Sequence, residues 1–483
     1  MIERVSLMNH VPLVTDIFLR GSGRMRTKGW FLCGTAIVLV AASGSGVWAA
    51  AKAKPLPLQG CIETALKRSV LIHAAREGVR GAEAQQREAF TGFLPKLSTS
   101  YSYTRLNADP TVTSPATSMT LPPPLGSVTI PPNTYQVGTK DNYNWSLEAR
   151  QPLFAGGGIL ANYEASRLAA EIARLEEVRT VQDIVLDVKV SYFNILKAER
   201  ILVVARQSVE QLKAHRDTAQ SFYDVGLIPR NDLLYAEVEL ANSRQFLVRA
   251  ENGVEMTKAK LNTVMRREIN APVEIEDILN TLPYGKGLEA CIAEALENRT
   301  EIRSYLLRVE QARSIVKVLK SEYYPSISLI GNYAKYGDTP GVAGSPYKDQ
   351  ESWTILAVAN WSFWEWGKTK HRVASGQSRE NQTAHLLTNV RDQITLEVKN
   401  AFLLLREAEK QIQVTKKAIE QAEENYRINA ERYREQVGTS TGVIDAQTIL
   451  TKARSDHFNA LGDFNIRLAN LGWVMGVTQS GRE

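Results

Sequence analysis

The residue types that could carry chemistry are few in this 483-residue chain, and they do not cluster. Six histidines are scattered, and none stands with cysteines at the spacing of a metal site. Gly156, Gly157 and Gly158 follow a predicted strand, as in a phosphate-binding loop, but no lysine follows where such a loop requires one. We therefore predict that the chain is not an enzyme and uses no metal or cofactor.

The three cysteines do not predict a disulfide framework. Cys33 lies in an N-terminal apolar run, where a lipid-anchor cysteine is not expected. Cys61 and Cys291 occupy equivalent positions in two repeats and are predicted to be small buried residues. A disulfide between them, formed in an oxidising compartment, is the alternative.

An internal repeat organises the chain, because residues 58–104 return without a gap as residues 288–334. At this offset of 230, matching pairs include Leu58/Leu288, Cys61/Cys291, Ala65/Ala295, Ile72/Ile302, Val79/Val309, Pro95/Pro325 and Tyr103/Tyr333. We predict a first repeat at 51–270, a linker at 271–287, a second repeat at 288–477 and a tail at 478–483.

The N-terminal 50 residues are typical of a secretory signal peptide. Basic Arg24, Arg26 and Lys28 precede an apolar run and an alanine-rich end, with cleavage expected near 49–53. A permanent membrane anchor is the alternative, and Met25 is an alternative start. Residues 1–49 hold five basic and two acidic residues, so the net charge falls from +6 to +3 without them. Neither this charge nor any clustered basic stripe favours nucleic-acid binding.

Two proline-free stretches predict very long helices. No proline lies between Leu153 and Ile228 or after Tyr347, and proline inside a helix costs about 3 kcal/mol. Apolar residues recur there in steps of three and four, as in a coiled-coil seam. Helices over 159–222 and 367–437 would be about 100 Å long at roughly 1.5 Å per residue, so they must project from any compact core.

Each long helix is followed by a turn and a returning helix. Val225–Pro229 and Val437–Gly442 form the turns, and the return helices end near 267 and 475. Shorter helices at 58–93 and 288–323 open the repeats. The hairpins therefore span 159–267 and 367–475.

Between the short and the long helix of each repeat, the hydrophobic period changes to two. Apolar Tyr143, Trp145 and Leu147 alternate with polar residues, and Trp353, Ile355 and Ala357 alternate in the second repeat. Strand pairs are predicted within 96–154 and 326–364, each joined by an irregular loop, 106–141 or 335–351. About ten alternating residues rich in Tyr and Trp are typical of a transmembrane strand, although a soluble sandwich shows the same alternation.

Four strands cannot close a barrel, and open sheet edges are not tolerated in lipid. The chain must therefore oligomerise, and three copies would supply twelve strands. The helices would continue the wall as a tube, which is a conduit that needs no chemistry.

This order of elements resembles that of the TolC-like outer-membrane efflux proteins. The resemblance covers about residues 55–477. Its motifs are QPLFAGG at 151–157, YDVGL at 223–227, WSFWEWG at 361–367, RYREQVGT at 432–439 and VIDAQ at 443–447.

The resemblance implies a mixed membrane α+β fold, internally duplicated. Four transmembrane strands per protomer would form a twelve-stranded β-barrel in a homotrimer, continued by a long α-helical coiled-coil barrel. It implies a place in the outer membrane of a Gram-negative bacterium, in contact with its lipid, with the helices in the periplasm. The function implied is the exit duct of a tripartite efflux or type I secretion system. The partners would be a hexameric periplasmic adaptor and, through it, an inner-membrane pump or ABC exporter.

In that family the two hairpin turns dock the adaptor. The residues that match here are Val225, Gly226, Leu227, Val437, Gly438 and Thr439; the alternative is that their glycines only permit the turn. A periplasmic gate is implied near the tips, with Glu431, Glu435 and Asp445 as candidates; the alternative is that each is a solvated charge on the helix surface. Measured back from Ala236 and Ala446, Gly226 aligns with Gln436 and Gly438 lies two residues later, so the glycines of the two tips are out of register.

Two other interpretations compete with the duct. A periplasmic adaptor-like coiled-coil protein without its own channel also contains a long helical hairpin, but normally one and without duplication. A passive porin would lack the long helices.

Overall fold

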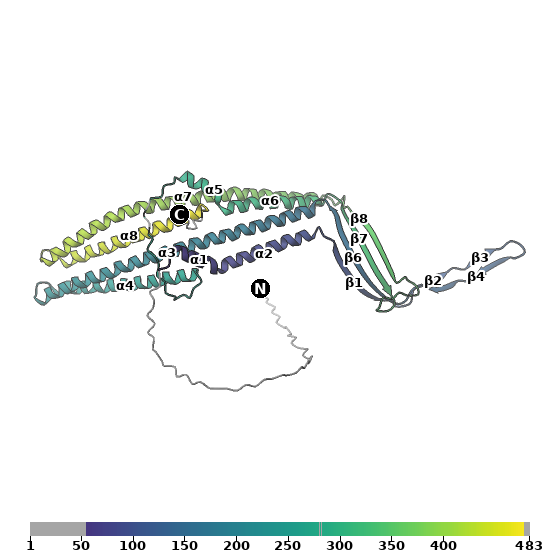
Figure 1. Ribbon diagram of the computed structural model, residues 1–483, viewed down its shortest axis with the longest axis horizontal. Coiled ribbons are helices and arrows are strands. Elements are labelled where there is room, and N and C mark those ends of the chain that lie inside the picture. Colours follow the sequence, from purple (N-terminus) through teal and green to yellow (C-terminus); the bar gives the residue numbers. More distant parts are fainter. Residues whose placement is uncertain (1–54, 280, 282, 478–483) are drawn as a thin grey trace, which may run out of the picture. The chain divides into compact units, whose positions relative to one another are not determined.

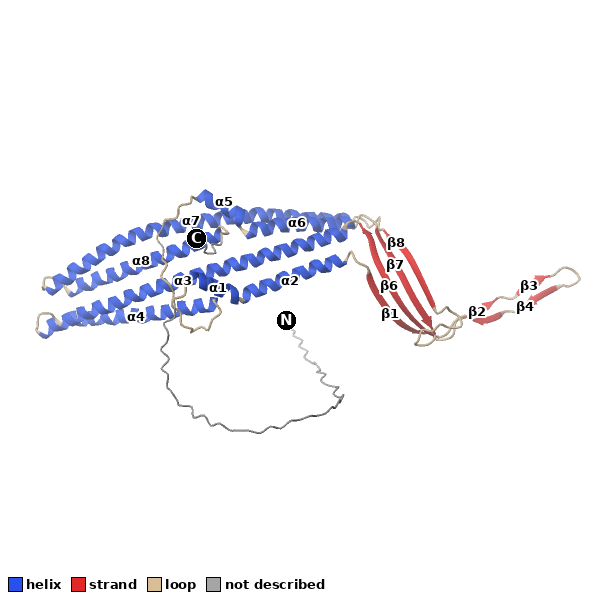
Figure 2. Ribbon diagram, in the orientation of Figure 1, coloured by secondary structure: helices blue, strands red, loops and turns tan. Residues whose placement is uncertain are grey.

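The computed structural model describes residues 55–279, 281 and 283–477. The predicted signal peptide, Cys33 and the predicted tail lie outside these described residues. Within them, eight helices lie beside one another and a four-stranded sheet continues from one end of the helices (Figures 1 and 2).

The same succession of elements occurs twice. In the first half it is α1 (Leu58–Arg68), α2 (Val70–Thr91), β1 (Lys96–Arg105), β6 (Asp141–Ala155), α3 (Gly158–Asp224) and α4 (Arg230–Val264). In the second half it is α5 (Leu288–Asn298), α6 (Thr300–Ser321), β7 (Ser326–Gly337), β8 (Glu351–Asn360), α7 (Lys368–Arg434) and α8 (Ser440–Val474). Each half thus holds one long helix, α3 or α7, and two strands of the main sheet.

The two opening helices are each broken, whereas the sequence predicts them as continuous. Ser69 and Arg299, equivalent at the offset of 230, both take extended backbone angles between two helices. Ser69 caps α2 by accepting a hydrogen bond from the Ile72 amide at 3.4 Å. Arg299 makes no such cap and uses its side chain elsewhere, as described below.

The loop predicted as irregular at 106–141 is also different. It contains four short strands, β2 (Thr111–Ser114), β3 (Thr117–Thr120), β4 (Ser127–Ile130) and β5 (Asn133–Gln136), paired β2 with β5 and β3 with β4. Prolines at 110, 115, 122–124, 131 and 132 divide this stretch into segments of a few residues, so the strands are too short to show a period in the sequence.

Two matching cores hold the helices together. One packs α1 against α3 and the end of α4, and the other packs α5 against α7 and the end of α8. Equivalent residues fill them, including Cys61/Cys291, Ile72/Ile302, Val188/Val398 and Leu261/Leu471. Both cysteines are free and fully buried in separate cores, so the disulfide alternative is not formed. Burial raises the pKa of the Cys61 thiol to about 11.

The main sheet is antiparallel, in the order β1-β6-β7-β8. Its register places most apolar residues of the four strands on one face, where Leu147, Tyr333 and Trp353 form one row with Thr99. The next row, on the opposite face, is polar: Ser98, Glu148, Asn332 and Thr354. The alternation predicted strand by strand therefore becomes one mainly apolar and one mainly polar sheet face. The polar face also holds Ile330, Leu356 and Val358. No helix in the described part of the chain is both long enough and apolar enough to cross a membrane.

Candidate functional site

The glycines that follow β6 serve packing. Gly156 has φ of 58°, and a Cβ atom there would lie 2.5 Å from the carbonyl oxygen of Ser321. A side chain at Gly158 would likewise collide with the Ser321 hydroxyl. These residues therefore let the strand turn into α3 directly against the end of α6.

The two helical hairpins have the same length. Helices α3 and α7 have 67 residues each, and α4 and α8 have 35 each. The turns also match. The Gly226 amide donates to the Tyr223 carbonyl and the Gln436 amide donates to the Tyr433 carbonyl, and both residues of the second pair lie 210 positions after those of the first. Gly226 and Gln436 are therefore equivalent, and Gly438 lies two residues after the position that matches Gly226.

Gly226 and Gln436 adopt the left-handed conformation in equivalent places, with φ of 76° and 59°. Gly438 sits two residues later, where a Cβ would lie 3.1 Å from the Arg432 and Tyr433 backbone. In the first turn glycine is needed for the positive φ angle. In the second turn it is needed because the backbone of Arg432 and Tyr433 passes close to it.

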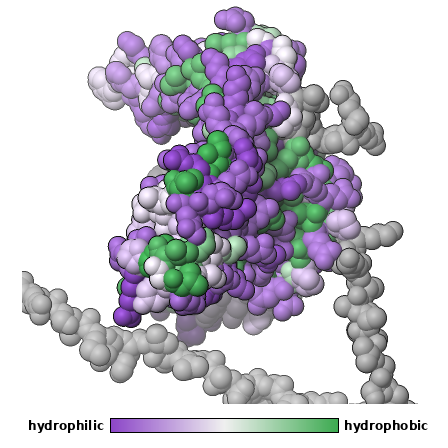
Figure 3. Space-filling model, turned by 90° about the vertical axis from the view of Figure 1, so that its left-hand side faces the viewer, coloured by the Kyte–Doolittle hydropathy of each residue, from purple (hydrophilic) through white to green (hydrophobic). Residues whose placement is uncertain are grey.

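The predicted tip residues leave apolar side chains in solvent. Val225 is 69% exposed and Val437 is 66% exposed, and Leu227 is exposed beside them. Gly226 and Thr439 are also exposed, and Gly438 is half-buried. Seen from the end that carries the tips, hydrophobic side chains form small separate patches among hydrophilic ones (Figure 3).

The three gate candidates have different surroundings. Glu431 pairs with Arg427 at 2.8 Å, and Arg427 also pairs with Glu424. These two carboxylates raise the pKa of Arg427 above its usual range. Glu435 and Asp445 are exposed and form no ion pair with any described residue. Their assignment to a gate stays a prediction.

A buried polar contact between the two hairpins escaped the sequence analysis. His215 of α3 is 7% exposed, and its Nε2 lies 2.9 Å from the hydroxyl of Ser440 at the start of α8. The imidazole also packs on the ring of Tyr433 in α7, with 4.8 Å between centroids. Phe222 covers the same tyrosine at 5.5 Å. The sequence offered only an isolated histidine, because its partners lie more than 200 residues away.

This contact makes stability depend on pH. Burial lowers the pKa of His215 from 6.5 to about 4, so the fold favours the neutral imidazole. The contribution of the neutral His215 to the free energy of unfolding is complete above the pKa of the unfolded state. It is lost as the pH falls toward 4, by about 2 kcal/mol between pH 7 and pH 5. Denaturation midpoints at these two pH values should differ less in His215→Phe, which keeps a ring but cannot titrate. An equal pH dependence in both proteins would contradict this assignment; His457 is common to both and cancels.

An ionic network joins four helices where α5 meets α6. Arg299 is buried, and its guanidinium lies 3.0 Å from Glu301 and 3.0 Å from Glu397 of α7. It also donates to the carbonyl of Val474 at 3.3 Å and lies over the ring of Trp473.

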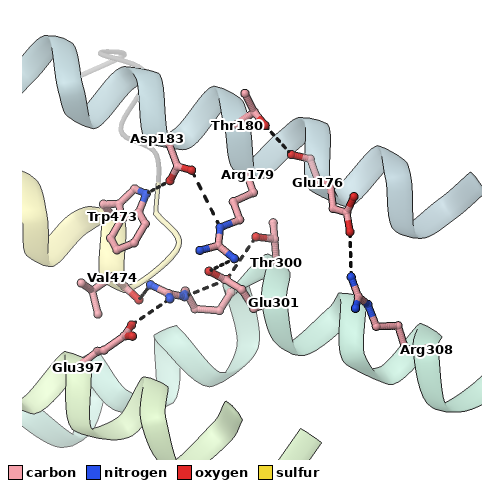
Figure 4. A network of polar contacts seen from close by, with 11 residues as sticks. Glu176, Arg179, Thr180, Asp183, Thr300, Glu301, Arg308, Glu397, Trp473 and Val474 are labelled. Carbon is pink, nitrogen blue, oxygen red and sulfur yellow. Dashed lines mark hydrogen bonds and ion pairs between the residues drawn. The ribbon is translucent and has the colours of Figure 1, made fainter. Parts of the chain in front are cut away.

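The same network continues to α3 (Figure 4). Trp473 donates from Nε1 to Asp183 at 2.8 Å, and Arg179 pairs with Glu301 at 3.4 Å. At its border Arg308 of α6 pairs with Glu176 at 2.9 Å, where both side chains are exposed. Arg299 is the buried member that connects α7 and α8 to the rest.

Aromatic side chains lie in the segment that connects the end of β8 to the start of α7. Trp361, Phe363, Trp364 and Trp366 are all exposed. Trp361 and Phe363 contact each other, as do Trp364 and Trp366. Rings of this kind are enriched where a membrane surface meets water.

The family model described as "Outer membrane efflux protein" matches residues 61–265 and 291–477. The outer membrane protein TolC of Escherichia coli (strain K12) is 21% identical over 371 residues, which is 73% of this chain and 74% of that protein.

Solved structures share the fold at low identity. The Campylobacter jejuni CmeC outer membrane channel is 16% identical, with a TM-score of 0.72 over 88% of this chain and 87% of that one. The open state of the Neisseria gonorrhoeae MtrE outer membrane channel is 18% identical, with a TM-score of 0.70 over 88% and 91%.

Proposed function

Because this chain belongs to the outer membrane efflux protein family, we propose that it is the exit duct of a tripartite efflux or type I secretion system. It resides in the outer membrane of a Gram-negative bacterium. The duct would receive substrate from an inner-membrane pump or ABC exporter through a periplasmic adaptor. The family assignment favours this function over the adaptor-like alternative.

The observation that carries the proposal is the two-faced sheet with free edges. In the described residues β1 pairs only with β6 and β8 only with β7. The unpaired backbone groups of these edges cannot remain open in lipid, so other copies must complete them. Three copies would close a twelve-stranded barrel with the apolar face toward lipid and the polar face toward a lumen.

The helices would extend this lumen through the periplasm. Each copy supplies two hairpins whose long helices measure about 100 Å at roughly 1.5 Å per residue. The adaptor would dock at the tips, at Val225, Gly226, Leu227, Val437, Gly438 and Thr439, and a gate would lie near Glu431, Glu435 and Asp445. We also propose that residues 51–270 and 288–477 are the two structural repeats of the chain.

The direct test is the mass of the native protein extracted from outer membranes. We expect a trimer that needs detergent and forms conducting channels in a planar lipid bilayer. A monomer that fractionates with the soluble periplasmic proteins would exclude the duct.

A further inference from the structure

The hairpin between β1 and β6 is unlike the rest of the sheet. It carries β2–β5 and projects beyond the end of the four-stranded sheet (Figure 1). No charged residue occurs from Pro110 to Thr139, and every residue of its four strands is exposed.

The outer part of this hairpin has two different faces. Met119 lies opposite Val128, and Thr117 lies opposite Ile130, so these four residues share one face. Ser118 opposite Thr129 and Thr120 opposite Ser127 form the other, purely hydroxyl face. Met119, Val128 and Ile130 are 57%, 49% and 55% exposed.

Such a hairpin is poorly stable by itself. Two strands without a third strand or a packed helix are marginal in water. Cross-strand hydroxyl contacts, such as Ser118 with Thr129 at 3.2 Å and Thr113 with Thr134 at 3.0 Å, are solvated and add little. The face that carries Met119, Val128 and Ile130 would therefore be stabilised by packing against another apolar surface.

In the proposed trimer the hairpins of the neighbouring copies offer such a surface, and this step rests on the proposed function. Twelve strands about 4.8 Å apart and tilted by about 40° give a perimeter of about 75 Å, which places equivalent points on neighbouring copies about 20 Å apart. Each hairpin arm from Thr111 to Leu125 can extend about 50 Å at roughly 3.3 Å per residue. Three arms are thus tethered within reach at millimolar effective concentration, and no like charges keep them apart.

We propose that the three hairpins pack together around the symmetry axis through the face that carries Met119, Val128 and Ile130, forming a collar above the outer mouth. The hydroxyl faces then meet water. The occupant of each apolar face is the same face of a second copy of this chain.

Cysteines on the two faces test the collar. In the purified trimer, oxidation of Val128→Cys should give covalent dimers on a denaturing gel, because equivalent residues meet near a three-fold axis. The adjacent Thr129→Cys is the matched control on the hydroxyl face and should give at least tenfold less dimer. Cys61 and Cys291 are fully buried and do not compete.

A second variant tests whether a disulfide at position 128 depends on the apolar contact or arises from random collision of the hairpins. Adding Met119→Asp to Val128→Cys should reduce the dimer at least tenfold while native mass still reports a trimer, because three carboxylates cannot share an apolar contact. A trimer with equal dimer yields at positions 128 and 129, or with no dimer at 128, would overturn the collar and leave the duct intact. A monomeric native mass would overturn both.

Discussion

Replacing Arg299 with alanine is expected to destabilise the protein by about 3–5 kcal/mol, the usual result of removing one partner from a buried ion pair. The Arg299 side chain is 6% exposed, and Glu301 at 13% would keep a buried charge without its nearest partner. The carbonyl of Val474 and the ring of Trp473 would also lose their contacts. Guanidinium denaturation followed by far-UV circular dichroism measures the change.

Arg308→Ala is the matched control, because it removes a pair with Glu176 in which both side chains are exposed. Exposed pairs are worth about 1 kcal/mol or less. If both variants shift the denaturation midpoint equally, the buried network does not hold α7 and α8 to the rest of the helices.

The second large effect concerns the tips. If the adaptor docks there, Val225→Asp together with Val437→Asp should weaken adaptor binding at least about 100-fold, because an unpaired charge would enter an apolar contact. Export should be lost while the native mass still reports a trimer. Affinity measured on the purified partners and resistance or secretion measured in cells give the two readouts.

Val248→Asp provides the control, since Val248 is also an exposed valine but lies along α4, away from the turns. Unchanged binding in the tip double variant would remove the docking assignment. Valines are better probes than glycines here. A side chain at Gly226 would strain the left-handed backbone, and one at Gly438 would crowd Arg432, so both changes would deform the turn itself.

Much of this architecture could be predicted from local patterns. The absence of proline over 153–228 and after Tyr347 left room for helices of 67 residues. The period of two in the strands predicted which side chains share a face, because a strand alternates regardless of its partners. These features depend only on residues close together in the sequence, so the sequence of a single chain is enough to predict them.

Other features depend on contacts between distant residues. The breaks at Ser69 and Arg299 interrupt patterns that continue helically on both sides, and the reason for the second becomes visible only when Glu397 and Val474 surround it. His215 and Ser440 lie 225 positions apart and gave no joint signal. The sequence also showed no sign that Gln436 takes the left-handed conformation in the second turn, because glycine is the residue that usually adopts it.

The equal lengths of the two hairpins have a consequence for symmetry. In the proposed trimer, three chains would present six tips that end at one level, since each pair of helices matches residue for residue. A ring of six identical subunits could then meet a three-fold assembly with six nearly equivalent contacts. Gly226 in one turn and Gln436 in the other make the six tips two alternating kinds. The ring would therefore distinguish odd from even positions, and its affinity for the two kinds need not be the same.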